Sequence, residues 1–216
     1  MKKASVLLGV LAVAVAQSFA ADMKPLKLDF PPSQLEGTPV PVKLAGLTPV
    51  EESNPVPMVP ADVKNIALKK AVTASDDFPL EGELEYITDG NKAANQGCYV
   101  DITGGLQWVQ IDLGKESEIF AVAVWHFHSQ KRAYNDVVIQ VSNDKEFKNG
   151  VTTIYNNDHD NSAKLGKGTD KPWIETNEGK LIPLKAPVKA QYVRLYSDGN
   201  STNEVNSYIE VEVFGR

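Results

Sequence analysis

The sequence contains a single cysteine, Cys98, so the chain by itself cannot form an intramolecular disulfide. Basic residues are also scarce relative to acidic ones, because 22 lysines and arginines stand against 28 acids and give a formal charge of −6. Phosphate contacts require clustered basic side chains, so this balance argues against nucleic acid as a partner. Beyond residue 20 no apolar run is long enough to cross a bilayer. We therefore expect no transmembrane anchor in the mature chain.

Common catalytic motifs are also missing. The sequence has no GxSxG nucleophile motif and no HExxH zinc motif, and the glycines at 166 and 168 lack the spacing of a phosphate-binding loop. A glycosidase needs two carboxylates that face each other across a cleft, and the sequence alone does not pair the acids in this way. We therefore expect a protein that is not an enzyme.

Three segments with different compositions follow one another along the chain. Residues 1–20 contain two lysines, an apolar run and a final Ser-Phe-Ala, the features of a secretory signal peptide cleaved near Ala20. This predicts a secreted or periplasmic protein. Residues 21–63 hold nine of the 13 prolines, which predicts an extended arm, either free as a linker or docked as a strap. Residues 64–216 form the folded domain.

Period-two alternation dominates the folded domain. Apolar and polar residues alternate through 105–114 and again through 118–127, and we expect these two stretches to pair as a hairpin. Shorter runs of the same kind follow, separated by turn residues, and no long helical pattern appears. The sequence predicts an all-β, antiparallel jelly-roll β-sandwich. The remaining expected strands are 65–75, 99–102, 137–142, 151–155, 180–184, 191–196 and 208–214.

The order of the motifs resembles a known family. NIALKKAVTAS, ITDGN, GLQWVQIDLGK, AVAVWH, VVIQVSND, QYVRLYS and IEVEVFG follow one another between Asn65 and Gly215. This series resembles the discoidin domain, also called the coagulation-factor C-type domain, a galactose-binding-like jelly roll that is similar to family 32 carbohydrate-binding modules. The resemblance implies a binding module whose ligand is a sugar, a lipid or a protein.

The resemblance also implies a structural calcium ion (Ca2+). Sugar-binding members hold the ion between a DGN loop and a glutamate of the last strand, and Asp89, Asn91 and Glu210 occupy the matching positions. Carboxylate and amide oxygens suit this hard cation. The alternative is that DGN is a simple turn and that Glu210 is an exposed strand residue.

A second group of candidates follows the strand that ends near residue 127. His126 and His128 are two residues apart, so a strand would direct both imidazoles to one face. Together with Arg132 and Tyr134, they are candidates for sugar binding, which the resemblance implies for the histidines and Arg132. Alternatively, Arg132 pairs with Asp136 and only orders the loop. A further alternative is a transition-metal site on the two histidines.

Two polar loops complete the candidate site. The loop 156–171 contains Asn157 and Asp158, and Trp173 follows it. Its spacing of acids resembles the start of an EF-hand, but Ala163 and Thr169 stand where that motif needs glycine and glutamate. Asn200 and Asn203 lie in the loop before the last strand and offer amide groups to sugar hydroxyls.

These observations predict an exported, non-catalytic module that recognises carbohydrate or a glycoconjugate through loops at one end of a β-sandwich. Two other hypotheses stay open. One is a structural or adhesion protein that binds other proteins of the cell envelope. The other is a small metal-dependent enzyme that uses His126 and His128.

Overall fold

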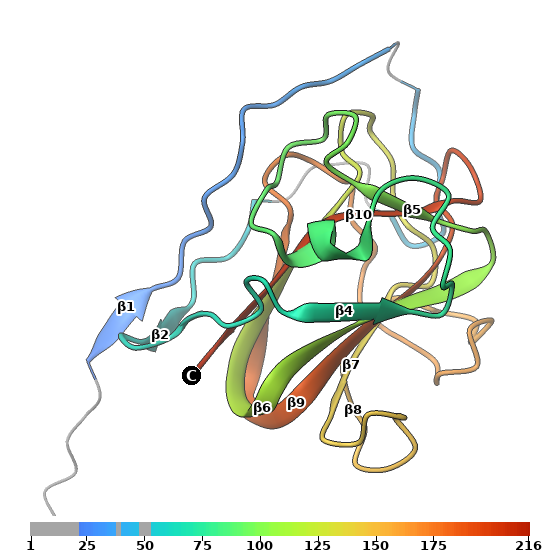
Figure 1. The fold of residues 1–216 in the computed structure, drawn as a ribbon. Helices are drawn as coiled ribbons and strands as arrows, with labels where there is room; N and C mark the ends of the chain where they lie inside the picture. The colour runs from blue at the N-terminus through green and yellow to red at the C-terminus, as the bar shows by residue number, and fades with distance from the viewer. Residues whose placement is uncertain (1–21, 38–39, 48–52) are drawn as a thin grey trace, which may run out of the picture.

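A computed structural model describes residues 22–37, 40–47 and 53–216 (Figure 1). The predicted signal peptide lies outside the described residues. The structure is almost entirely β, as predicted, with one 3-10 helix, η1 (Leu84–Thr88). The strands are β1 (Met23–Pro25), β2 (Met58–Pro60), β3 (Lys64–Asn65), β4 (Ala71–Ala74), β5 (Val100–Ile102), β6 (Leu106–His126), β7 (Val138–Ser142), β8 (Thr152–Asn156), β9 (Lys180–Asp198) and β10 (Asn206–Gly215).

Two long bent strands, β6 and β9, connect the layers of the sandwich. Residues 106–112 of β6 pair with 192–198 of β9, whereas 121–124 of β6 pair with 180–183, and the register shifts between these parts. The first part of β6 also pairs with β4, and the second part pairs with β10. The predicted hairpin between 105–114 and 118–127 is therefore wrong. The break is a bulge, and the chain continues through it from one layer into the other instead of folding back.

The main core lies between the two layers. Alternating side chains of β6 face inward from both of its halves, such as Val109 and Ile111 from the first and Val122 and Val124 from the second. They pack against apolar side chains of β7, β9 and β10 and are fully or almost fully buried. This arrangement confirms the predicted antiparallel β-sandwich.

The proline-rich segment packs on the outer face of the layer that contains β10. Leu26 and Val59 are 5% and 3% exposed, and they belong to a second apolar cluster with Trp125 and Ile209 of the sheet. Burying such side chains stabilises a fold by about 1.5–3 kcal/mol each. β1 and β2 pair with each other as a two-stranded sheet. The segment thus covers an apolar sheet face that would otherwise be exposed to water.

Strand pairing shows which loops meet. The strand ends that flank four loops pair with one another, so these loops lie together at one end of the sandwich. They are the connections 103–105, 127–137, 157–179 and 199–205. The pairs that fix this arrangement are Leu106↔Asp198, Val138↔Tyr196, Val138↔Asn156, Tyr208↔His126 and Asn206↔Ile102. β10 runs from this end to the C-terminus at the other (Figure 1). Within the described part of the chain, no helix is long and apolar enough to cross a membrane.

Candidate functional site

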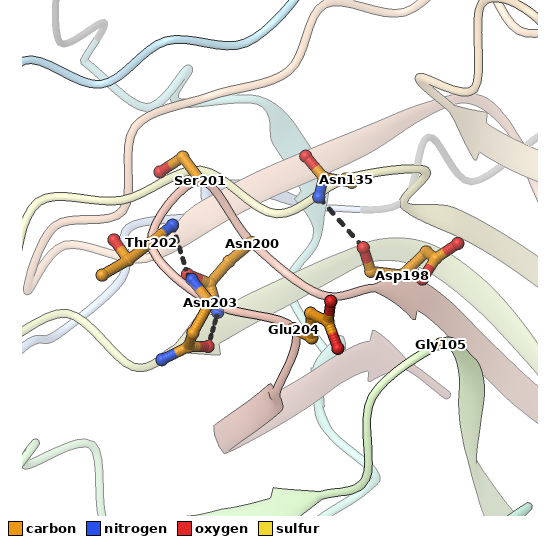
Figure 2. A pocket seen from close by; sticks show the side chains of 8 residues that line it. All are labelled: Gly105, Asn135, Asp198, Asn200, Ser201, Thr202, Asn203 and Glu204. Carbon is orange, nitrogen blue, oxygen red and sulfur yellow. Dashed lines mark hydrogen bonds between the residues drawn. The ribbon is translucent and has the colours of Figure 1, made fainter.

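A cavity of about 520 Å3 opens at the loop end, and we call it the amide cavity. Its wall carries mostly amide, hydroxyl and carboxylate groups, which Figure 2 shows around the 199–205 loop. These groups donate and accept hydrogen bonds in the way that a polyhydroxylated ligand requires. The lining residues are Gly105, Asn135, Asp198, Asn200, Ser201, Thr202, Asn203 and Glu204.

Asn200 orders the loop that forms this cavity. Its Oδ1 accepts hydrogen bonds from the backbone N–H groups of Thr202 (2.9 Å) and Asn203 (3.1 Å). Its Nδ2 donates to Asn203 Oδ1 (Figure 2) and also to the carbonyl of Val205. Such local side-chain bonds are typical of Asn in turns. Asn200 is buried, while the side chains of Thr202 and Asn203 remain exposed toward solvent. The predicted candidates Asn200 and Asn203 therefore lie together, one as a support and one at the surface.

A second cavity of about 480 Å3, the acidic cavity, adjoins the first and shares Asn135 and Asp198 with it. Carboxylate oxygens of Asp136, Asp158 and Asp160 lie within 4.8 Å of one another there. The predicted candidates Asn157 and Asp158 belong to this region, although both side chains are buried. The lining residues are Leu44, Ala45, Asn135, Asp136, Asn157, His159, Asp160, Ser162, Pro172 and Asp198.

Beneath these cavities, His126 forms a buried pair with Glu175. Its Nδ1 lies 2.7 Å from Glu175 Oε1, and both side chains are fully buried. The imidazole stacks on Tyr134, with ring centroids 4.1 Å apart, and on Trp173 at 5.9 Å. The structure therefore brings three of the sequence candidates, His126, Tyr134 and Trp173, into one cluster. This cluster is interior and supports the loops from below.

Several polar atoms of the interior cluster have no hydrogen-bond partner among the described residues. They include His126 Nε2, Tyr134 Oη, Trp173 Nε1 and Glu175 Oε2. Burial raises the pKa of Tyr134 to about 12, so its phenol stays protonated and remains a hydrogen-bond donor. Buried groups of this kind are normally satisfied, and ordered water is the usual partner where protein groups are out of reach.

His128 and Arg132 make separate contacts. His128 Nε2 lies 3.0 Å from the carbonyl of Lys92, so the two histidines have different partners and do not converge on one metal position. The guanidinium of Arg132 lies over the ring of Phe127 (4.7 Å to the centroid), and its Nη2 donates to Gln130 Oε1. Both side chains are at least 95% buried. Asp136, the alternative partner considered for Arg132, instead accepts a hydrogen bond from Ser162 Oγ.

The predicted calcium ligands lie on the sheet layer under the proline-rich segment. Glu210 is fully buried, so it is not the exposed strand residue of the alternative hypothesis. Its Oε2 accepts a hydrogen bond from the Gly90 N–H, while its Oε1 has no partner among the described residues. Burial raises its pKa to about 9, and the nearby charges of Glu212 and Asp89 act in the same direction. A buried carboxylate oxygen without a partner, close to Asp89, fits a cation.

The other two calcium candidates already hold the DGN loop together. Asp89 Oδ1 accepts from the N–H of Asn91, and Asn91 Oδ1 accepts from the N–H of Ala93. Both side chains are exposed, and each oxygen keeps a second lone pair for a metal. The oxygen donors near Gly90 are thus compatible with Ca2+. Glu210 would benefit most from the ion, because its Oε1 is buried without a partner among the described residues.

Sequence reasoning missed several residues of the loop end. Glu175 comes from a segment without a strand or motif signal, and only its distance from His126 reveals its role. Thr202 and Asp160 stand beside residues that were singled out, and the turn composition of their loops gave the only available signal. Leu44 and Ala45 come from the proline-rich segment, which no local pattern connects to the loop end.

The chain is similar to known proteins in sequence and in fold. A family model described as "F5/8 type C domain" matches residues 71–211. The search of curated proteins gave no match. Among solved structures, chitosan-binding module 1 of a chitosanase/glucanase from Paenibacillus sp. IK-5 is 26% identical, with a TM-score of 0.51, over 70% of this chain and 99% of the module.

Two further solved structures match with TM-scores just below 0.5. A fucolectin from the serum of striped bass, Morone saxatilis, is 20% identical over 71% of this chain and 49% of its own, with a TM-score of 0.49. The family 32 carbohydrate-binding module of C. perfringens NanJ, solved with galactose, is 15% identical over 68% of this chain and 93% of its own, also with a TM-score of 0.49.

Proposed function

Because the chain belongs to the F5/8 type C domain family, we propose that it is an exported, non-catalytic carbohydrate-binding module. The observation that carries this proposal is the amide cavity at the loop end, whose wall of amide and hydroxyl groups matches the chemistry of sugar hydroxyls. The similar solved structure of a chitosan-binding module supports carbohydrate as the ligand class. The predicted signal peptide supports export.

Binding in this proposal uses a preformed surface. Asn200 fixes the loop before any ligand arrives, so Ser201, Thr202 and Asn203 lose little conformational freedom on binding. Asn135 is fixed as well, because its Nδ2 donates to the carbonyl of Asp198 (3.0 Å). Few polar contacts are available, so the affinity for a single sugar unit is modest.

The interior cluster acts as a support in the same proposal. The pair of His126 and Glu175 connects the end of β6 to the segment before β9, and the ring of Tyr134 packs on the imidazole. This joins the 127–137 and 157–179 loops under the cavities. His126, His128, Arg132, Tyr134 and Trp173 thus hold the loop end in shape, and a ligand reaches the exposed residues above them.

A structural Ca2+ ion forms the second part of the proposal. Glu210 and Asp89 would hold it, with Asn91 as a further oxygen donor, and the ion would neutralise the carboxylates that crowd this part of β10. The supporting observation is Glu210 Oε1, which is buried without a partner among the described residues. The ion would tie the DGN loop to β10 and take no part in contacting sugar.

A direct test is to measure binding of the purified mature chain to a panel of immobilised glycans, in calcium and again in a chelator. We expect saturable binding to a subset of glycans and no turnover of those that bind. Calcium is expected to raise thermal stability more than glycan affinity. Failure to bind any glycan, together with a stable complex with an envelope protein, would favour the adhesion hypothesis and contradict this proposal.

A further inference from the structure

Phe78 is the most exposed large apolar side chain among the described residues. It is 85% exposed and stands in the loop between β4 and η1, which runs beside β5 (Figure 1). Single exposed apolar residues are common on protein surfaces and indicate nothing by themselves. The surroundings of Phe78 therefore decide whether its ring can serve a ligand.

The loop holds Phe78 in a fixed position. The carboxylate of Asp76 accepts the Phe78 N–H (3.0 Å) through Oδ1 and the hydroxyl of Thr103 (2.8 Å) through Oδ2. Two residues beyond Phe78, the N–H of Leu80 donates to a backbone carbonyl of β5 (2.7 Å). Pro79 restricts its own φ and also the backbone of the residue before it. An aromatic ring on such a backbone loses little conformational freedom when a ligand covers it.

The same loop is joined to the wall of the amide cavity. The partner of the Asp76 carboxylate, Thr103, begins the 103–105 connection, and the last residue of this connection lines the cavity. Asn206 fixes the connection, because its Nδ2 donates to the carbonyls of the first and last residues (2.9 and 3.0 Å). Its Oδ1 accepts the N–H of the first residue of the 199–205 loop (2.8 Å). The loop between β4 and η1 and the cavity wall therefore form one hydrogen-bonded unit.

The charged side chains around this surface are acidic. Four acids and no lysine or arginine stand in the loop between β4 and η1, namely Asp76, Asp77, Glu81 and Glu83. The described residues that line the amide cavity likewise include two acids, Asp198 and Glu204, and no basic residue. A ligand with carboxylate, sulfate or phosphate groups would be repelled here. This disfavours acidic polysaccharides and the surface of an anionic membrane.

The apolar area around Phe78 is small, which also limits the occupant. The loop adds Leu80, which is 62% exposed, and Leu106 follows the 103–105 connection at 38%. A stable protein interface buries about 800 Å2 on each partner, far more than one ring and two leucines offer. The C–H face of a pyranose, in contrast, is about the size of a single phenyl ring, and burying the two faces against each other favours binding.

We propose that Phe78 is the stacking platform for a neutral pyranose ring, in a subsite beside the amide cavity, and that the acidic side chains around it exclude anionic sugars. This inference rests on the proposed carbohydrate binding and deepens it, because it names the charge class of the ligand. One sugar unit forms hydrogen bonds with the amide and hydroxyl groups of the cavity. A further unit of the same chain lays its C–H face on the ring of Phe78.

The test measures binding of soluble hexasaccharides to the full mature chain by isothermal titration. The neutral probes are oligomers of glucose, mannose and galactose. The acidic probe is the oligomer of galacturonic acid, which differs from the galactose oligomer by a carboxylate at C6 of each unit. We expect at least one neutral oligomer to bind with an affinity that does not change with salt. The galacturonic acid oligomer should bind at least tenfold more weakly at low salt.

Variants of Phe78 test the platform itself. Phe78→Ala should weaken binding of the neutral oligomer about tenfold, because it removes the ring and keeps the backbone hydrogen bonds of the loop. Phe78→Trp keeps an aromatic face and should bind as the parent does, with a change in indole fluorescence on titration. Neither variant should alter thermal unfolding, because the ring is exposed. The matched control is Phe30→Ala, which removes another exposed ring, in the proline-rich segment, and should leave affinity unchanged.

Each other outcome would overturn the inference. Unchanged affinity in Phe78→Ala, while the parent binds a neutral oligomer, would remove the subsite and leave carbohydrate binding intact. Equal or tighter binding of the galacturonic acid oligomer would contradict the charge class. Absence of binding to every glycan tested would overturn both proposals. Sedimentation of the parent with phosphatidylcholine vesicles, with or without phosphatidylserine, that Phe78→Ala abolishes would replace the sugar with a membrane.

Discussion

The imidazole of His126 and the carboxylate of Glu175 form a fully buried pair, with Nδ1 and Oε1 2.7 Å apart, under the loops that form both cavities. One residue ends β6, and the other stands in a loop 49 positions later. The pair therefore links two parts of the chain that no strand pairing joins, and the geometry of the loop end depends on it.

Breaking this pair should destabilise the fold strongly. Glu175→Leu leaves the imidazole without its partner, and His126→Phe leaves a buried carboxylate, so each should lower the free energy of unfolding by about 3 kcal/mol. The double variant should cost clearly less than the sum of the two, with a coupling of about 1–2 kcal/mol. Urea denaturation of the four proteins measures this. Strict additivity would show that the pair contributes nothing beyond its separate side chains.

Calcium should stabilise the chain through Glu210. At a calcium concentration one hundred times the dissociation constant, the free energy of unfolding should rise by about 2.7 kcal/mol, and a chelator should remove this increase. Glu210→Gln should abolish this increment, because it removes the buried anionic oxygen. Glu212→Gln is the matched control on the same strand, since Glu212 already pairs with Lys92 at 3.0 Å. Glu212→Gln should keep the calcium-dependent increase in stability. Thermal unfolding with and without chelator distinguishes the two variants.

Thr202 should contribute directly to glycan binding through its hydroxyl. Thr202→Val keeps the shape of the side chain and removes the donor and acceptor, so affinity should fall about fivefold, as expected for a net hydrogen bond of about 1 kcal/mol. Thr152→Val, at another exposed threonine at the start of β8, should leave affinity unchanged. Equal affinities of both variants and the parent would place the ligand elsewhere.

Asp76 should affect stability in a pH-dependent way. Hydrogen bonds from the N–H of Phe78 and from Thr103 lower the pKa of this carboxyl below its ordinary value. The stabilisation of the fold by the Asp76 carboxylate is therefore fully present above the unfolded-state pKa, near 3.8. It is lost as the pH falls through the lower pKa of the folded state. Asp76→Asn replaces one of the two carboxylate oxygens with an NH2 group, so it cannot accept from both Phe78 and Thr103 and should cost about 1 kcal/mol at neutral pH. The difference from the parent should shrink below about pH 4 in acid unfolding curves. A constant difference at all pH values would contradict the assignment.

Much of the fold could be predicted because strand signals are local. Alternation along β6, β7 and β10, together with the turn residues between them, is enough to predict an antiparallel sandwich. The hairpin prediction failed because pairing is not local. The bulge after Asp112 redirects β6, and both of its halves pair with distant parts of β9. Only the three-dimensional structure shows which strand each half of β6 pairs with.

The candidate site was harder to predict because burial depends on contacts between distant residues. His126, at the end of a predicted strand, and Asn203, in a predicted loop, were both candidates for sugar binding, yet one is fully buried and the other is exposed. The difference arises because Glu175 and Tyr134 enclose the imidazole, while residues 201–204 are exposed to solvent. Likewise, the contact of Gly46 with His159 joins positions more than a hundred residues apart.

The central claim is that the loop end of the sandwich binds carbohydrate, and mapping a bound glycan by NMR tests it most directly. Titration of the isotope-labelled mature chain with the best ligand from the glycan panel should shift backbone amide signals in 133–136, 157–163 and 199–205. Signals of the β7–β8 turn, at 143–151, should stay unchanged. Shifts confined to that turn, or none at saturating ligand, would contradict the account.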